Sequence, residues 1–232
     1  MAEPDEDLDA LVRRVDPDRW LSSRFIADPA ARADAIAIYA CDHELARAPR
    51  VASNSLLGEI RLTWWREALD EIFEDRAVRL HPTAQALAAA VRRRGLPREP
   101  LEAMIDARYR ELDATPMTAQ EALAWARDTG GAAARAAAAV LDADQDGAGA
   151  VDAGAAWRLA RRVAADPMTA EPYQAALRGT LAAARRSARS LSVAAFPAVA
   201  HAALAGGLAK GRAPADWSAR LRLIWAVASG RI

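Results

Sequence analysis

The pattern of apolar and polar positions repeats with the period of an α-helix along the whole chain. The clearest stretch, Tyr39 to Phe73, predicts two helices joined by a tight connection near Val51. In the second of these helices, apolar side chains fill more than half of the circumference when successive residues are placed about 100° apart. A helix with so wide an apolar arc is expected deep in a helical protein, in contact with several neighbours.

A charged residue stands in the middle of each apolar face, Asp42 in the first helix and Arg61 in the second. Asp42 lies nine residues before Val51 and Arg61 lies ten after it, so an antiparallel pair of helices brings both to one level. Buried charges need partners. We therefore predict an Asp42–Arg61 ion pair. The rest of the buried face of the first helix is expected to consist of Ala35, Ile38, Tyr39, Leu45 and Ala46.

The remainder of the chain also reads as helices and connections, and no stretch alternates polar and apolar residues as a strand would. Asp28-Pro29 supplies an N-cap followed by proline at the first helical position. The pair Gly130-Gly131 is expected to break or kink the helix that carries Trp125, which would allow a close approach there. The predicted helices cover residues 5–15, 18–26, 29–48, 54–76, 83–95, 98–113, 118–140, 150–166, 170–190, 194–206 and 215–229. No repeat or shift of composition indicates a second domain, so one domain over residues 1–232 is predicted.

The composition of the chain argues against several classes of protein. The 31 basic and 31 acidic residues cancel, which argues against a general nucleic-acid binder. The single cysteine, Cys41, rules out an internal disulfide and suits a reducing compartment. The acidic N-terminal segment lacks the apolar core of a secretory signal. Ser190 to Ala209 carries no charge, but its alanines, Pro197 and Gly206-Gly207 favour a core helix over a membrane span. We expect a cytoplasmic protein, and contact with the inner membrane surface stays open.

No metal site is predicted. Asp142 to Gly147 matches the first half of an EF-hand calcium loop, but its twelfth position is Ala153 where a bidentate glutamate is needed. A plain interhelical loop is the preferred interpretation, and whether the loop binds calcium is left open. The three histidines lack the spacing of a zinc site, and neither a phosphate-binding glycine loop nor a nucleophile elbow occurs.

Several segments together resemble a known family. They are DPAARADAIAIYA (28–40), GEIRLTWWREAL (58–69), MIDARYRELDATP (104–116), WARDTGGAA (125–133), GAAWRLARRVAADP (154–167), AFPAVAHAALA (195–205) and RLRLIWAVASGR (220–231). In their order and spacing the chain resembles the squalene/phytoene synthase family, and most closely its branch with the respiratory complex I assembly factor and bacterial relatives. The resemblance implies an all-α helical bundle of the isoprenoid synthase type, with a C-terminal half that looks shortened after Pro167.

The family's enzymes condense two prenyl diphosphates and hold Mg²⁺ with two DxxxD motifs. Residues four apart share a helix face, so each motif offers two carboxylates to the metal. By the family pattern, the acids of the first motif fall at Ala46 and Arg50. In the region of the second motif this chain has Arg161, Arg162 and Ala165. We therefore expect no catalysis and no cofactor.

Three hypotheses follow. The first is a catalytically degenerate assembly or lipid- and partner-binding factor; the resemblance implies complex I assembly, with a respiratory-chain subunit as partner. The second is an active prenyltransferase that uses Mg²⁺ and the remaining inward acids, Asp42, Asp106 and Asp113; the alternative for the last two is surface acids paired with Arg108 or Arg110. The third is a metal-independent prenyl or lipid carrier, which would need a long apolar tunnel.

Arginines near the family's cavity walls could bind a diphosphate or an anionic lipid head without a metal. The candidate cavity residues are Tyr39, Arg47, Arg50, Arg61, Arg161 and Arg162. Seven tryptophans are many for this length, and most fall on apolar stripes. Any that prove exposed together would mark a partner or membrane surface.

Overall fold

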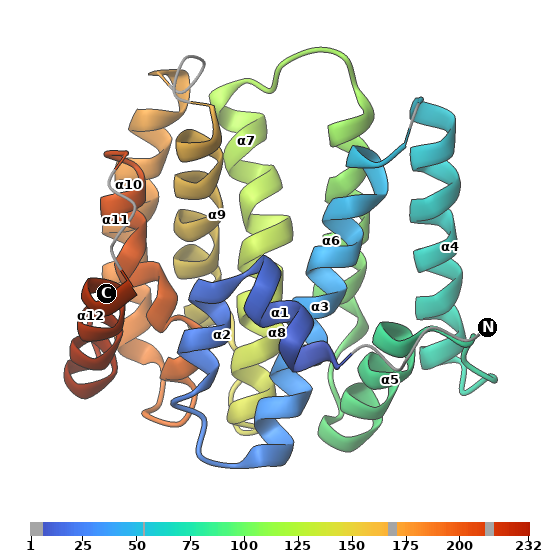
Figure 1. Ribbon diagram of the computed structural model, residues 1–232, viewed down its shortest axis with the longest axis horizontal. Helices are drawn as coiled ribbons and strands as arrows, with labels where there is room; N and C mark the ends of the chain where they lie inside the picture. The colour runs from blue at the N-terminus through green and yellow to red at the C-terminus, as the bar shows by residue number, and fades with distance from the viewer. Residues whose placement is uncertain (1–6, 53, 167–170, 212–215) are drawn as a thin grey trace.

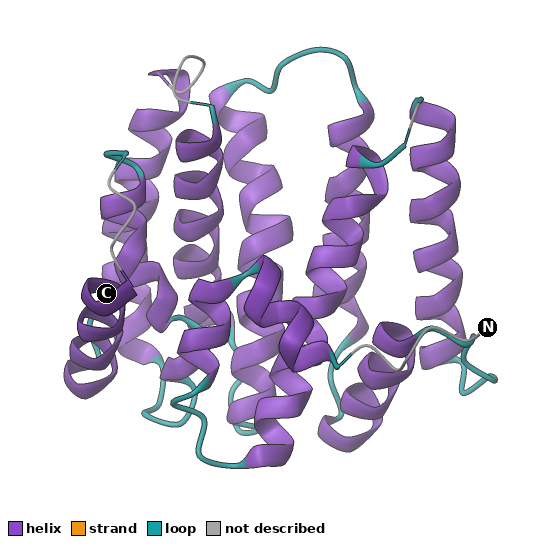
Figure 2. Cartoon of the chain, viewed as in Figure 1, coloured by secondary structure: helices purple, strands orange, loops and turns teal. Residues whose placement is uncertain are grey.

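The computed structural model describes residues 7–52, 54–166, 171–211 and 216–232, and these consist of helices and connections without a strand (Figures 1 and 2). The prediction of an all-α fold is confirmed. The α-helices are α1 (Leu8–Val15), α2 (Pro17–Ser23), α3 (Pro29–Arg50), α4 (Ser55–Phe73), α5 (Pro82–Arg94), α6 (Arg98–Tyr109), α7 (Ala119–Ala126), α8 (Ala132–Leu141), α9 (Val151–Ala165), α10 (Glu171–Ser187), α11 (Ala205–Leu208) and α12 (Asp216–Ser229). Residues 5, 6, 170 and 215, at the starts of three predicted helices, lie outside the described residues.

Local signals set several helix ends. The Asp28 carboxylate accepts the backbone N–H groups of Ala30 and Ala31 at 3.0 and 3.1 Å, and Pro29 takes the first position of α3. Gly95 closes α5 with a φ of 63°, a left-handed conformation that glycine adopts without the steric cost of a side chain.

The long helices stand side by side, with α4 at one edge of the molecule and α10 to α12 at the opposite edge (Figure 1). Helix α3 runs through the middle and packs against α1, α4, α5, α6 and α8. Its predicted face is buried as expected, and Ile38 and Leu45 are fully enclosed. This central position means that any charge on the inner face of α3 must be balanced from neighbouring helices.

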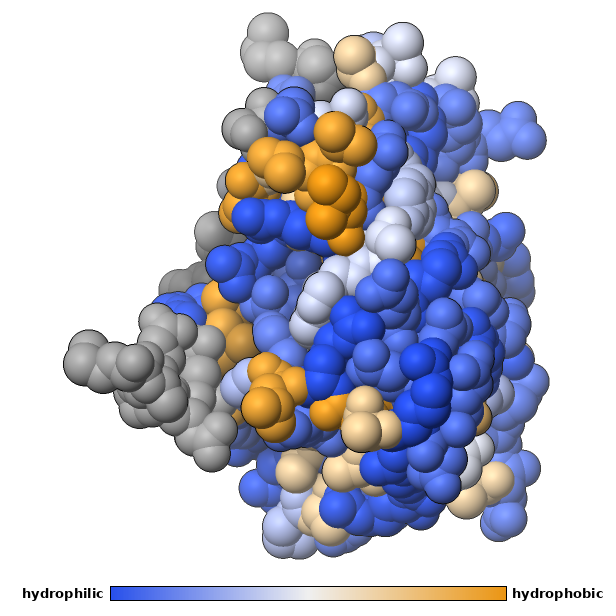
Figure 3. All heavy atoms as spheres, turned by 90° about the vertical axis from the view of Figure 1, so that its right-hand side faces the viewer, coloured by the Kyte–Doolittle hydropathy of each residue, from blue (hydrophilic) through white to orange (hydrophobic). Residues whose placement is uncertain are grey.

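Helix α4 does not lie deep in the protein, contrary to the expectation. Leu62, Trp65 and Leu69 are buried against its neighbours α3, α5 and α6, but Leu56 and Ile60 are 62% and 55% exposed. Figure 3 looks onto this side of the molecule and shows an apolar area in its upper half. The angular pattern indicates which side chains share a face, but the number of neighbouring helices depends on the tertiary arrangement.

The glycine pair changes the helix that carries Trp125, as predicted. A π-helical turn, Arg127–Gly131, separates α7 from α8. A side chain at Gly130 would stand 2.6 Å from the carbonyl oxygen of Gly154 in α9. The absence of side chains at both glycines therefore lets α9 approach this turn closely, which positions the neighbouring Arg158.

The uncharged segment 190–209 forms short turns instead of the single predicted helix. The 3-10 turns Phe196–Ala198 and Ala200–Leu204 and the short α11 follow one another. The Ser22 hydroxyl donates to the Pro197 carbonyl at 2.6 Å and ties this segment to α2. Within the described residues, no helix combines the length and the apolar character needed to cross a bilayer.

Candidate functional site

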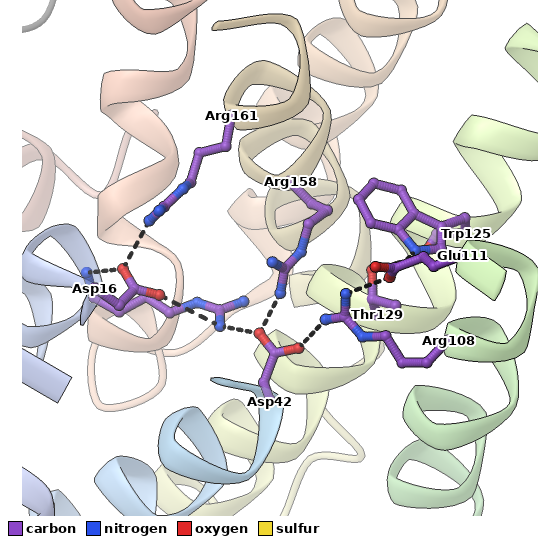
Figure 4. Close-up of polar contacts among 9 residues, drawn as sticks. Asp16, Asp42, Arg108, Glu111, Trp125, Thr129, Arg158 and Arg161 are labelled. Atoms are coloured by element: carbon purple, nitrogen blue, oxygen red, sulfur yellow. Dashed lines mark hydrogen bonds and ion pairs between the residues drawn. The ribbon is translucent and has the colours of Figure 1, made fainter. Parts of the chain in front are cut away.

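Asp42 is the centre of a buried charge cluster (Figure 4). Its carboxylate, on the inner face of α3, accepts hydrogen bonds from Arg19 of α2 at 2.6 Å and from Arg108 of α6 at 2.7 Å. Arg158 of α9 contacts the same carboxylate. One aspartate thus joins four helices.

Arg19 and Arg108 make further contacts besides those with Asp42. The Arg19 guanidinium lies 4.3 Å from the ring centroid of Trp157 and 5.1 Å from that of Tyr39. Arg108 also donates to Glu111 at 2.6 Å, and the Glu111 carboxylate accepts the indole N–H of Trp125 at 2.8 Å.

A second carboxylate continues the cluster outward. Asp16 accepts the backbone N–H of Arg19 at 3.3 Å and lies 3.4 Å from Nη1 of Arg161. Asp16 therefore links the buried Arg19 to the half-exposed Arg161.

The electrostatics follow from burial and from these neighbours. Burial would raise the pKa of Asp42, but the charges of Arg158, Arg19 and Arg108 outweigh burial and hold that pKa well below its usual range. For Arg158, burial and the adjacent Arg108 and Arg19 together lower the pKa to about 10, despite the opposing pull of Asp42. The three guanidinium groups that contact Asp42 are matched by three carboxylates, those of Asp42, Asp16 and Glu111.

The predicted Asp42–Arg61 ion pair does not form. Arg61 is exposed on α4, and the partners of Asp42 come from α2, α6 and α9. The expectation that Asp42 is buried and needs a basic partner is confirmed, while the identity of the partner was wrong. The level of a residue along a helix pair does not determine which way its side chain points.

Beside Asp42 lies a cavity of about 340 Å³, here called the arginine cavity. It is lined by Val15, Asp16, Asp42, His43, Ala46, Arg50, Arg108, Glu111, Trp125, Trp157, Arg158, Arg161, Arg162 and Ala165. Of the six candidate residues, Arg50, Arg161 and Arg162 lie here.

The other three candidates lie elsewhere. Arg47 and Arg61 line a separate pocket of about 270 Å³ beside Trp64, Trp65 and His81. Tyr39 is buried beneath Arg19, and burial raises the pKa of its hydroxyl to about 12. The sequence therefore grouped residues that the fold divides between two pockets and the core.

The sequence matches the squalene/phytoene synthase family over residues 12–166, which is most of the chain. The chain belongs to the squalene/phytoene synthase family. A bovine (Bos taurus) protein, NADH dehydrogenase (ubiquinone) complex I, assembly factor 6, is 34% identical over 104 residues. That match covers 44% of this chain and 30% of the relative's length.

The positions that the family pattern assigns to the first metal-binding motif do line the cavity, but Ala46 and Arg50 occupy them. On the facing helix α9, Arg161, Arg162 and Ala165 line it. The described carboxylates of the cavity are Asp16, Asp42 and Glu111, and each contacts at least one arginine. Among the described residues, no three acidic, histidine or cysteine side chains are grouped to hold a metal ion. This donor set does not fit the Mg²⁺ of the family's enzymes.

The acids of the enzyme hypothesis are not brought together. Asp106 is exposed and pairs with Arg66, and Asp113 is exposed and lies 3.3 Å from Arg110. The alternative of surface acids thus holds for both, although Asp106 has a different partner from the one expected.

In the calcium-like loop, two carboxylates accept hydrogen bonds from backbone N–H groups of the loop itself. The Asp142 carboxylate accepts the N–H of Asp144, and the Asp146 carboxylate accepts the N–H of Ala148.

Sequence reasoning missed Arg19 and Arg158 and placed Arg108 only as a partner of surface acids. A signal for Arg108 existed, since it follows Leu101 and Met104 by seven and four residues and so shares their apolar helix face. Arg19 and Arg158 carry no comparable signal, because their burial arises from helix packing that the sequence does not display.

Proposed function

We propose that this protein is a non-catalytic member of the squalene/phytoene synthase family that binds an anionic group in the arginine cavity and acts in the assembly of respiratory complex I. The anion-binding part of this proposal rests on one observation. The cavity walls present Arg50, Arg161 and Arg162 on the two helices where the family's enzymes place metal-binding carboxylates. A wall of guanidinium groups attracts the phosphate oxygens directly.

The arginines of the cavity have unused donors. Nε of Arg158 and Nε of Arg162 are buried with no hydrogen-bond partner among the described residues. Buried polar groups are normally paired, and an unpaired one costs roughly 1–3 kcal/mol. A phosphate or diphosphate oxygen would satisfy such donors, and its charge would offset the surplus of arginines in the described cavity lining, where five arginines face three carboxylates. The ligand is thus a phosphate-bearing molecule, whether free or the head of a lipid.

The carrier hypothesis is less well supported. A prenyl chain needs an apolar tunnel, and ligand pockets usually measure roughly 300–1,000 Å³. The apolar hollow between α3, α4 and α6, beside Cys41, Trp65 and Leu101, has only about 10 Å³. The core is filled by side chains, which favours a scaffold that binds a phosphate group over a carrier of the whole lipid.

The assembly role rests on the bovine relative, whose name states that it is an assembly factor of complex I. A respiratory-chain subunit is the partner class that this likeness suggests. Action on the cytoplasmic side, at or near the inner membrane, accords with this role.

Incubation with farnesyl and geranylgeranyl diphosphate plus Mg²⁺ tests the absence of catalysis. We expect no pyrophosphate release above the protein-free blank, with an active phytoene synthase as positive control. Robust turnover would contradict the proposal.

Deletion of the gene in its host tests the assembly role. We expect less assembled complex I on native gels stained for NADH dehydrogenase activity, with restoration by the wild-type gene. Unchanged complex I in the deletion strain would remove this part of the proposal and leave the binding part intact.

A further inference from the structure

The charges of this chain are unevenly distributed. Residues 171–232 contain nine of the 31 basic residues and only two of the 31 acidic residues. This part therefore carries a formal charge of +7, and residues 1–170 carry −7. The zero net charge hides a strongly basic C-terminal part, which includes α10, α11 and α12 at one edge of the molecule (Figure 1).

Helix α12 exposes an apolar stripe on its outer side. Its inner side buries Ala219, Leu223 and Ala226, and it packs against α2 and the turn Ala200–Leu204. The outer stripe, here called the α12 stripe, consists of Trp217, Leu221, Ile224 and Trp225, which are 69%, 57%, 50% and 58% exposed. At helical spacing these four side chains share one face. Such a face on a water-exposed helix indicates an interaction surface.

Basic side chains border the α12 stripe. By helical angle, Arg220 lies on one side of the stripe and Arg222 on the other. Both are exposed, and neither forms an ion pair with any described residue. At the C-terminal end of α12, Arg189 and Arg231 line a groove of about 610 Å³ beside the exposed Val193. Among the side chains that the structure describes, basic groups therefore border the α12 stripe on both sides and at its C-terminal end.

We propose that the α12 stripe docks on an anionic lipid bilayer. Tryptophan prefers the boundary between headgroups and acyl chains, and leucine and isoleucine enter the apolar layer just below. The bordering arginines would reach sideways to lipid phosphates while their stems stay in the apolar layer.

Charge complementarity favours a membrane over a protein partner for this face. The other exposed apolar face, on α4, provides the contrast, because both acidic and basic side chains are exposed beside Ile60: Glu59, Glu67 and Arg61. An anionic bilayer therefore attracts the α12 face more strongly than the mixed charges of the α4 face. No residue of the α12 stripe lines the arginine cavity, so this proposal does not depend on ligand binding in that cavity.

Vesicle flotation with the full chain tests the proposal. We expect the protein to float with vesicles of phosphatidylcholine and phosphatidylglycerol and to stay behind with phosphatidylcholine alone. The double variant Leu221→Ser/Ile224→Ser should lower the partition coefficient by roughly tenfold or more, because two side chains no longer insert. Arg220→Glu/Arg222→Glu should reduce it at least as much at low salt.

The chain provides a matched control, Leu56→Ser/Ile60→Ser, which changes the same residue types at similar exposure on α4. This control should float like the wild type, and far-UV circular dichroism should show that all variants are folded. Failure of the wild type to bind anionic vesicles overturns the proposal. Equal losses in the control and the α12 variants overturn it too. A dimer in solution that Leu221→Ser/Ile224→Ser dissociates would assign the stripe to a second copy of the chain.

Discussion

The guanidinium of Arg108 donates to the Asp42 carboxylate at 2.7 Å inside the core, and this contact fixes α6 to α3. Both side chains are almost completely buried. A buried ion pair gains stability when further hydrogen bonds satisfy its remaining donors and acceptors. Arg19 and Arg158 also contact the Asp42 carboxylate. Glu111 accepts a second hydrogen bond from Arg108, whose Nε has no partner among the described residues. The cluster therefore acts as a unit, and loss of its central charge should affect every helix that meets there.

Removal of the Asp42 charge should destabilise the fold strongly. Asp42→Asn keeps the side-chain shape but leaves three buried arginines without their shared anion, and we expect a loss of about 3–5 kcal/mol in the free energy of unfolding. Urea denaturation measures this change. As a control, Asp106→Asn breaks an exposed pair with Arg66 and should cost less than about 1 kcal/mol. Equal losses of unfolding free energy in the two variants would show that the buried cluster stabilises the fold no more than a surface ion pair does.

The buried cluster also makes the stability of the fold depend on pH. Because the pKa of Asp42 is lowered in the folded state, the unfolded chain takes up the proton first as the pH falls. The stability contributed by Asp42 is fully present above its ordinary pKa of 3.8 and is lost progressively at lower pH. We expect the free energy of unfolding to fall below about pH 4 in the wild type and to fall less steeply in Asp42→Asn. Identical acid slopes would contradict this assignment.

The close approach of α9 to the π-helical turn should not tolerate a side chain. In Gly154→Ala the new methyl group would clash with the Gly130 carbonyl oxygen and the Ala134 side chain, and we expect a loss of about 1–3 kcal/mol. Gly179→Ala in α10 is the matched control, because nothing lies near its added methyl group. That control should be stabilising by roughly 0.5–1 kcal/mol through helix propensity. Thermal unfolding followed by circular dichroism distinguishes the two.

Pyrophosphate should bind in the arginine cavity without Mg²⁺. We expect it to raise the melting temperature of the wild type, because ligands that bind only the folded state stabilise it. Arg50→Gln/Arg162→Gln removes two cavity charges and should weaken binding at least about tenfold, as measured by calorimetry.

The control for this prediction is Arg47→Gln/Arg61→Gln, which removes two charges from the neighbouring pocket. It should bind pyrophosphate like the wild type. An equal loss in both double variants would mean that general charge and not the cavity attracts the anion. A strict requirement for Mg²⁺ would restore the metal-based interpretation of this site.

The sequence was sufficient for much of the fold. Apolar periodicity and caps such as Asp28-Pro29 predicted the helices and most of their limits, because those signals act within one or two helical turns. The pattern also identified Asp42 as a buried charge, and the family resemblance placed Ala46 and Arg50 at the cavity. The replacement of the family's acids by Ala46 and Arg50 was also visible in the sequence, because residue type and spacing can be read without coordinates.

Only the tertiary structure decided which residues meet. Arg19 and Arg158 reach Asp42 from helices that lie 23 and 116 residues away along the chain, and no local pattern encodes such contacts. Arg61 faces outward because α4 has neighbours on one side only. The sequence by itself determined the helices and the chemistry on each face. The packing of those helices determined which charges are buried together, because burial depends on the neighbours that long-range folding supplies.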